Sequence, residues 1–223
     1  MVRHGTYVRR DRCARQGGVK LNPVELALVN NPLRSLLLRA TVSRLHDAAC
    51  APPLERVLEI GCGVGAGVEE ILRRFRPGAI DAFDLDEAQV ARARARLAGR
   101  SRNGLELRLW VGDAERIDAE DGRYDAVFEF TIFHHIPNWR RAIAEVRRVL
   151  RPGGAFLFEE LSREYFFDTA VLGALLRRFT VHPWESMFDF PAFRRALVEE
   201  GFELRALHSR FLPGWHEGVA VRR

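Results

Sequence analysis

The sequence is nearly free of lysine, although the chain is basic. Lys20 is its single lysine, while lysine and arginine together number 35 and the net charge is +5. A positive charge of this kind raises the question of nucleic acid as a partner. The arginines, however, are scattered among acids along the predicted helices, and a general bias toward arginine explains them equally well. Nucleic acid is therefore the less favoured kind of partner.

Cysteine is scarce, and long apolar runs are missing. Cys13, Cys50 and Cys62 are odd in number and widely spaced, which is typical of reduced thiols rather than of a disulfide framework or a metal cluster. No apolar run is long enough to cross a bilayer, and the first residues lack the apolar core of a signal peptide. We therefore expect a cytoplasmic protein with no metal and no membrane partner.

The length and composition indicate one soluble globular domain. At 223 residues, with 47% hydrophobic and 29% charged residues, the chain can bury a core without disulfide or metal support. No repeat or low-complexity linker divides it. We expect four parts: an N-terminal arm with lid helices (1–50), a cofactor-binding core (54–158), a lid insert rich in aromatic residues (159–190), and a C-terminal helix with two strands (191–223).

Strands and helices alternate from Arg56 onward, which predicts a three-layer α/β sandwich. Continuous apolar runs at 126–128 and 155–158 are typical of strands buried on both faces of a parallel sheet. By contrast, apolar and polar residues alternate from Leu105 to Val111, which places this strand at an edge. The remaining predicted elements are helices starting at Asn22 and Asn31, a strand at 79–83, helices at 87–97, 139–150 and 191–200, and an antiparallel pair of strands at 204–208 and 218–221.

The stretch from Arg56 to Gly67 is the centre of the predicted fold. A short apolar run breaks into alternating glycines, and a helical pattern resumes at Val68, so the order is strand, tight turn, helix. Such a turn brings backbone N–H groups close to a ligand. It predicts a site for a nucleotide-type cofactor, although an ordinary glycine-rich loop would have the same pattern. The spacing Gly61-x-Gly63-x-x-Ala66 also satisfies the loose dinucleotide pattern, so the turn by itself leaves the cofactor open.

Acids follow the next two strands. Asp84 ends the second strand, where a carboxylate can accept both ribose hydroxyls of a cofactor. Its alternative role is a helix cap, but Asp86 already stands at that helix start. Asp113 ends the third strand and is placed to accept a hydrogen bond from an adenine amino group. Strand ends of a parallel sheet converge on one crevice, so we expect both acids beside the glycine turn.

The order of these motifs resembles the class I S-adenosylmethionine-dependent methyltransferases of small-molecule type, from about Leu54 to Gly154. The matching segments are 57–65, 83–86, 112–114, 124–127 and 149–154. The resemblance implies a Rossmann-like sandwich with a mostly parallel seven-stranded sheet and an antiparallel last strand. It also implies roles for single residues: Glu59 and the backbone of Gly61, Cys62, Gly63 and Gly65 at the methionine moiety, Asp84 at the ribose, Leu85 on one adenine face, Asp113 and Ala114 at the adenine edge, and Glu129 and Phe130 beside the sulfonium.

The chemistry requires little from the protein, because the sulfonium of the cofactor is already activated. The enzyme must align the acceptor with the methyl–sulfur bond and exclude water; a general base helps where the acceptor has to lose a proton, and S-adenosylhomocysteine is the product. His134 and His135 are the candidate bases, since imidazole titrates near neutrality. Their alternative role is structural, and two adjacent histidines make a poor metal site.

The residues after the fourth strand narrow the range of acceptors. The segment Glu129-Phe130-Thr131-Ile132 lacks the Asn/Asp-Pro-Pro-aromatic tetrapeptide of nucleobase and glutamine methyltransferases, and no cysteine is placed to attack a pyrimidine. We therefore expect a small apolar or aromatic acceptor, and a homodimer is compatible with the sequence. The alternatives are methylation of RNA or protein, a protein that binds the cofactor without turnover, and, least favoured, an oxidoreductase.

Overall fold

The computed structural model describes residues 22, 31–49, 53–100, 105–163, 186–209 and 214–223. A seven-stranded sheet forms the middle of the molecule, with the strand order β3-β2-β1-β4-β5-β7-β6. The strands are β1 (Arg56–Ile60), β2 (Ala79–Asp84), β3 (Glu106–Val111), β4 (Tyr124–Phe130), β5 (Leu150–Leu161), β6 (Phe202–Ser209) and β7 (Trp215–Arg222). This architecture confirms the predicted sandwich and places β3 at an edge, as its alternating sequence indicated.

Strand directions also agree with the expectation. β1 to β5 pair in parallel, and β7 is antiparallel to both of its neighbours, β5 and β6. Among the described strands, β7 alone therefore runs against the others, as the resemblance implied. The parallel register sets Ile60 beside Phe83 and Glu129, so the ends of the central strands lie level with one another.

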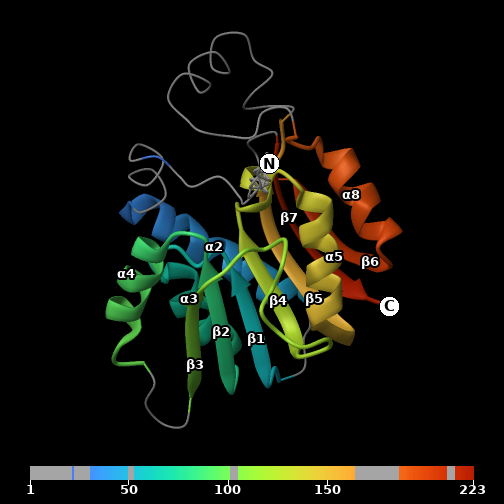
Figure 1. Cartoon of the computed structure of the whole chain (residues 1–223). Helices are drawn as coiled ribbons and strands as arrows, with labels where there is room; N and C mark the ends of the chain where they lie inside the picture. The colour runs from blue at the N-terminus through green and yellow to red at the C-terminus, as the bar shows by residue number, and fades with distance from the viewer. Residues whose placement is uncertain (1–21, 23–30, 50–52, 101–104, 164–185, 210–213) are drawn as a thin grey trace, which may run out of the picture.

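Two layers of helix cover the sheet (Figure 1). One face carries α2 (Pro32–Ala49), α3 (Ala66–Phe75) and α4 (Glu87–Leu97), and the other carries α5 (Trp139–Val149) and α8 (Phe190–Glu199). A 3-10 turn, η1 (Phe133–His135), follows β4. Each face has its own apolar core, one around Phe128, Val42 and Ile71, the other around Phe156, Phe193 and Ile143. None of the helices in the described ranges is long and apolar enough to cross a membrane.

Local capping explains where several helices start. Asn31 Oδ1 accepts the N–H of Arg34 at 2.9 Å and starts α2, and Asp86 caps α4 by accepting the N–H of Ala88. Asp189 does the same for α8 through the N–H of Ala192. These caps satisfy N–H groups that have no partner inside the helix. The predicted cap role of Asp86 is therefore confirmed.

β5 is longer than the apolar run that predicted it. The sequence indicated a strand at 155–158, whereas the strand runs from Leu150 to Leu161. Its last residues include Glu159 and Glu160, both fully buried. A hydrophobic pattern does not predict a buried strand where the residues are acidic. The two acids are tolerated here because Glu159 pairs with Arg34 and Glu160 pairs with His134. The predicted helix at Asn22, the N-terminal arm and residues 164–185 of the lid insert lie outside the described residues.

Candidate functional site

A cavity lies at the carboxyl ends of β1 to β4, beside the start of α2. Its volume is about 180 Å³, more than ten times the roughly 10–15 Å³ that one water needs on the same measure. The glycine turn, the ends of β2 and β3, the segment after β4 and the first turns of α2 form its walls. The crevice predicted from the strand ends is therefore present in the folded chain.

The glycine turn after β1 is fixed by backbone hydrogen bonds. The N–H groups of Gly61 and Cys62 both donate to the carbonyl of Phe83 at 2.9 Å, and the N–H of Gly65 donates to Cys62 O at 2.8 Å. Cys62 is a buried free thiol, and burial raises its pKa. Gly61, Cys62 and Gly63 line the cavity, and Gly65 ends the turn at the start of α3.

Glu59 lies beneath the first turn of α3. An added Cβ at Gly67 would come within 1.9 Å of Glu59 Oε1, so the close approach of helix and carboxyl requires glycine there. Glu59 lines the cavity and is 2% exposed, and within the described part of the chain its Oε2 has no hydrogen-bond partner. Burial, with a smaller contribution from Asp84, raises the pKa of Glu59 well above its usual range. A buried carboxyl oxygen without a partner at a cavity wall is suited to a ligand donor.

Asp84 joins the end of β2 to the glycine turn. Its Oδ2 accepts the N–H of Gly63 and its Oδ1 the N–H of Asp86, each at 2.9 Å. Burial raises the pKa of this carboxyl, and the two N–H groups partly offset the shift. Each carboxylate oxygen can accept more than one hydrogen bond, so Asp84 keeps acceptor capacity toward the cavity that it lines.

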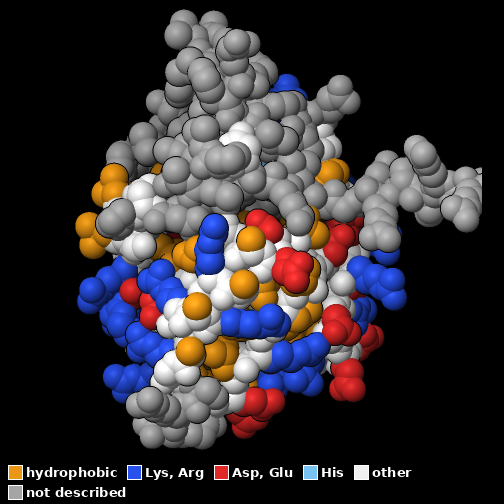
Figure 2. Space-filling view, turned by 60° about the vertical axis from the view of Figure 1, so that its left-hand side comes forward, with side chains coloured by type: hydrophobic (Ala, Val, Ile, Leu, Met, Phe, Trp, Pro, Cys, Tyr) orange, Lys and Arg blue, Asp and Glu red, His pale blue; other side chains and the backbone are white. Residues whose placement is uncertain are grey.

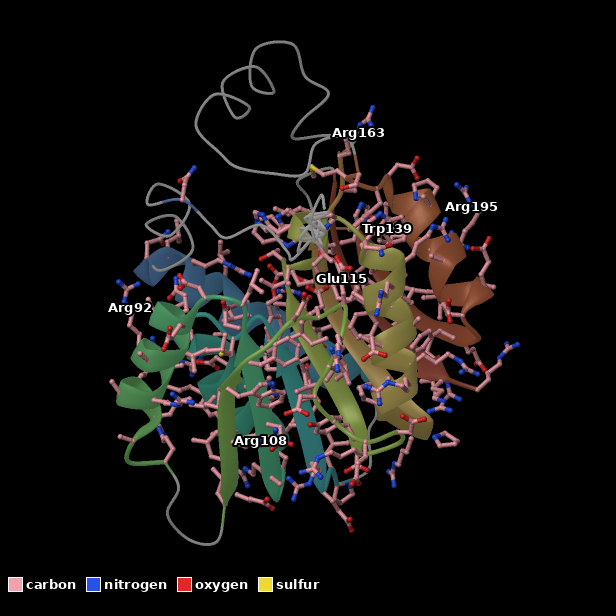
Figure 3. All side chains as sticks on the ribbon, viewed as in Figure 1. Arg92, Arg108, Glu115, Trp139, Arg163 and Arg195 are labelled. Carbon is pink, nitrogen blue, oxygen red and sulfur yellow. The ribbon has the colours of Figure 1, made fainter. Side chains whose placement is uncertain are left out.

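The end of β3 closes the other side of the cavity. Asp113 and Ala114 line it, as does Leu85 from the loop after β2. Asp113 Oδ1 also accepts the N–H of Glu115 at 2.9 Å, which fixes the turn. Figure 3 shows Glu115 near Trp139 at the start of α5, consistent with its Oε1 accepting the N–H of Asn138. Asp113 thus has both a structural bond and a place at the cavity.

The segment after β4 separates residues that the sequence grouped together. Phe130, Thr131 and Ile132 line the cavity, whereas Glu129 is absent from its lining and fully buried. Glu129 Oε2 accepts the N–H of Ile132 at 3.2 Å, so it lies behind the wall. Thr131 has a φ of 63°, a left-handed conformation that is costly for a residue with a Cβ. Its side chain bonds the Phe130 carbonyl at 2.6 Å and accepts from Arg34 at 3.2 Å.

The two adjacent histidines occupy different environments. His134 is 4% exposed and pairs through Nδ1 with Glu160, which also accepts the N–H of Phe133 at 2.7 Å. His135 lines the cavity, and its ring lies 4.2 Å from that of His134, centroid to centroid. Of the two, only His135 is placed to meet a ligand. Across the described ranges no group of three or more side chains could hold a metal ion.

The unpredicted residues of the cavity wall include two buried or half-buried polar side chains, Arg34 and Gln89. Arg34 of α2 pairs with the buried Glu159 at 2.9 Å and lines the cavity. Gln89 of α4 also lines it; it is 3% exposed, and its Oε1 has no hydrogen-bond partner among the described residues. Gln89 stands three positions after the Asp86 cap, where a glutamine is usual in a capping box. Its spacing in the sequence therefore indicates helix capping rather than a place in the cavity wall.

The surface around β3 and α4 carries many arginines. Figure 2 shows them separated by acidic, apolar and uncharged groups on the face that it presents. Several pair with acids: Arg108 with Asp118 at 2.8 Å, and Arg96 and Arg100 with Glu69 at 2.7 and 2.9 Å. Part of the positive charge on this face is thus balanced within the molecule.

Comparison with known proteins identifies the stretch around the cavity. A family model described as a methyltransferase domain matches residues 57–154. A fatty-acid O-methyltransferase of Mycolicibacterium smegmatis is 35% identical over 131 residues, which cover 57% of this chain and 45% of that protein. A phthiotriol/phenolphthiotriol dimycocerosates methyltransferase of Mycobacterium tuberculosis is 35% identical over 127 residues, 55% of this chain and 44% of that one. The chain spans less than half the length of these curated relatives.

Solved structures share the whole architecture. A SAM dependent methyltransferase from Aquifex aeolicus superposes with a TM-score of 0.69 at 17% identity, covering 92% of this chain and all of that one. A magnesium protoporphyrin IX methyltransferase from Synechocystis with bound SAM has a TM-score of 0.61 at 15% identity, covering 85% and 80%. At these identities the likeness concerns the fold. It agrees with the class I methyltransferase resemblance predicted from the motifs.

Proposed function

Because residues 57–154 are a methyltransferase domain on the class I, S-adenosylmethionine-dependent fold, we propose that this chain transfers a methyl group from S-adenosylmethionine to a small apolar acceptor. The observation that carries the proposal is the meeting of the glycine turn, Asp84, Asp113 and the segment after β4 in one cavity. These groups are spread over the carboxyl ends of four neighbouring strands, where open α/β sheets bind their ligands.

The residues present fit the cofactor. Glu59 supplies a buried oxygen without a hydrogen-bond partner in the described structure, suited to the methionine amino group beside the glycine turn. Asp84 would accept from the ribose hydroxyls, with Leu85 against the adenine face and Asp113 and Ala114 at its edge. S-adenosylmethionine, when bound, supplies a methyl group already activated on a sulfonium sulfur. The protein therefore has to position the acceptor and exclude water.

The β4 side of the cavity is the proposed methyl-transfer end. Since Asp84 and Asp113 occupy the β2 and β3 side, the opposite side faces Thr131, Ile132 and His135. Its walls also include Leu38, Phe130 and Ile136, each less than 9% exposed. Apolar walls of this kind favour an apolar acceptor and keep water out. His135 is the proposed base where the acceptor must lose a proton on attack.

The acceptor class rests on this wall and on the relatives. The names of the relatives refer to fatty acids and to phthiotriol dimycocerosates, and a further relative, of Gibberella zeae, is a sterol 24-C-methyltransferase that is 29% identical over 180 residues, 78% of this chain and 46% of that protein. We extend the common property, an apolar lipid-like acceptor, to this chain. Incubation with radiolabelled cofactor and a panel of fatty acids, sterols and phenolic lipids would show which one accepts the label.

Cofactor binding is the direct test. Titration calorimetry should show that S-adenosylmethionine and S-adenosylhomocysteine bind the wild-type protein. Asp84→Ala removes the proposed ribose acceptor and two bonds that hold the turn, so we expect at least a tenfold loss of affinity, about 1.4 kcal/mol. Asp118→Ala, at an exposed site paired with Arg108, is the matched control and should bind like the wild type. Absence of binding, or equal affinity in both variants, would contradict the proposal.

A further inference from the structure

The buried carboxyl of Glu129 lies outside the cavity lining and takes no part in the proposed cofactor contacts. It is fully buried near the end of β4, in register with Ile60 of β1, and Ile60 lines the cavity. Its Oε2 accepts the N–H of Ile132, a second cavity residue. Glu129 therefore lies directly behind the cavity wall at the proposed methyl-transfer end. Ile60 and Ile132, which both neighbour it, line the cavity.

The neighbouring buried acids are each matched by a partner. Glu160 accepts from the N–H groups of Phe133 and Leu161 and pairs with His134. Glu159 pairs with Arg34 at 2.9 Å. Glu217 accepts from Thr41 at 2.9 Å and from Arg44 at 2.7 and 2.6 Å. A nearby cation or hydrogen-bond donors offset the loss of hydration of each of these buried carboxylates.

Glu129 differs from these acids because no basic side chain among the described residues forms an ion pair with it. Its Oε1 also has no hydrogen-bond partner there, as is true of both carboxyl oxygens of Glu159. Burial, followed by the charge of Glu160, raises the pKa of Glu129 well above its usual range, while Arg34 has the smallest effect. The titratable and charged groups around Glu129 come from four elements: Glu159 and Glu160 of β5, His134 and His135 of η1, Arg34 of α2, and His216 and Glu217 of β7.

A ligand that brings positive charge to this end of the cavity would shift the equilibrium between the protonated and the ionised form of Glu129. A cation stabilises a nearby carboxylate and disfavours its protonated form. The effect is strong where water is excluded, because the local dielectric is low. In the proposed reaction, the substrate cofactor is a sulfonium cation, and its product is a neutral thioether. The two would therefore differ by one charge at the proposed methyl-transfer end, behind whose wall Glu129 lies.

We propose that Glu129 senses the charge of the bound cofactor and makes the site favour the sulfonium over the neutral product. This inference rests on the proposed function. Glu129 would act as a specificity residue through the electrostatic field, without touching the cofactor. It ionises when the cation binds and takes up a proton again once the methyl group has left. The product then loses the favourable interaction that held the substrate, which promotes its release.

The test measures protons and affinities together. Calorimetric titration in buffers of different ionisation enthalpy gives the number of protons released on binding. Near neutral pH, the wild-type protein should release up to one proton more with S-adenosylmethionine than with S-adenosylhomocysteine. A non-reactive analogue that carries a protonated amine in place of the sulfonium should behave like the substrate. If that analogue behaves like the product, the methyl group rather than the charge is recognised, and the inference is wrong.

Matched variants give a second measure. Glu129→Gln keeps the shape and an acceptor for the Ile132 N–H, and it should lower the preference for substrate over product at least fivefold, the lower end of typical coupling between sites. The difference from wild type should grow as pH rises, because only the wild-type carboxyl can ionise. Asp81→Asn is the control, since it also removes a buried carboxyl, but one that pairs with Arg123 at 3.3 Å and lies outside the cavity lining; its preference should equal that of the wild type.

The outcomes separate the two proposals. If neither substrate nor product binds, the proposed function fails, and the inference fails with it. If both bind with equal proton release and an unchanged preference in Glu129→Gln, the inference alone is wrong. Should Glu129→Gln fail to fold, the proton count of the wild-type protein decides the matter without a variant.

Discussion

The glycine turn offers a matched pair of substitutions that separates backbone strain from steric overlap. Gly61 and Gly63 both have left-handed backbones, with φ of 70° and 50°, a region that costs other residues about 1–2 kcal/mol. A Cβ at Gly61 would lie 2.4 Å from Cγ1 and 2.5 Å from Cδ1 of Ile132. A Cβ at Gly63 would have nothing within 4 Å among the described residues. The two sites thus share the strain and differ in the overlap.

The expected losses follow from these distances. Gly63→Ala should lower the free energy of unfolding by about 1–2 kcal/mol, from strain alone. Gly61→Ala should lose that amount and a further ~1–3 kcal/mol for overpacking. Urea unfolding of both variants, with the slope m checked against wild type, measures the difference.

A double-mutant cycle tests the cause. In an Ile132→Ala background the obstructing atoms are gone, so Gly61→Ala should cost only the strain, and the coupling should be about 1–3 kcal/mol. Equal losses for Gly61→Ala and Gly63→Ala, or an absent coupling with Ile132→Ala, would show that Ile132 moves aside freely and would refute the steric argument.

Two further predictions concern single side chains of the site. Burial raises the pKa of Glu59 in the folded protein. The folded state therefore holds a proton that the unfolded chain gives up above about pH 4.3. The free energy of unfolding of the wild-type protein consequently falls as the pH rises toward the folded-state pKa of Glu59. Glu59→Gln should remove this fall, so its stability relative to wild type should improve by up to about 1.4 kcal/mol per pH unit; parallel pH–stability curves would contradict this. For an acceptor that loses a proton, His135→Gln should lower kcat about 100-fold or more with cofactor affinity unchanged; an unchanged kcat in steady-state assays would exclude a base at this position.

The sequence predicted that the glycine turn and the acids after β2 and β3 meet at one cavity, because their placement depends on local geometry. The glycine turn, Asp84 and Asp86 lie within a few residues of strand ends, and strand ends are visible as apolar runs that stop at polar residues. Parallel topology then brings those ends to one edge of the sheet without further information. The cap at Asp86 and the edge position of β3 could be predicted on this basis, whereas the antiparallel direction of β7 in the sheet was implied by the family resemblance.

The other side of the cavity, formed by α2 and the segment after β4, depends on contacts between segments that are distant in the sequence. Nothing near Arg34 in the sequence indicates that its guanidinium reaches Glu159 of β5 and Thr131 after β4. Likewise, Glu129 and Phe130 are adjacent on one strand. Only the strand register and the alternation of side chains place Phe130 in the cavity wall and Glu129 behind it. The histidines are divided in the same way, because the partner of His134 is Glu160 from another strand.

The acidic residues of β5 and β7 explain why α2 is part of the proposed acceptor side of the cavity. Glu159 and Glu217 stand directly opposite each other in the antiparallel pair, an arrangement that is unfavourable for like charges. Both are buried, and α2 matches them with Arg34 and Arg44. The docking of α2 thus places a cation beside each of two neighbouring carboxylates, and the same docking brings Arg34 and Leu38 to the cavity wall. All these residues lie outside the matched domain of 57–154. The features that select the acceptor are therefore expected in the segments by which this chain differs from a general methyltransferase core.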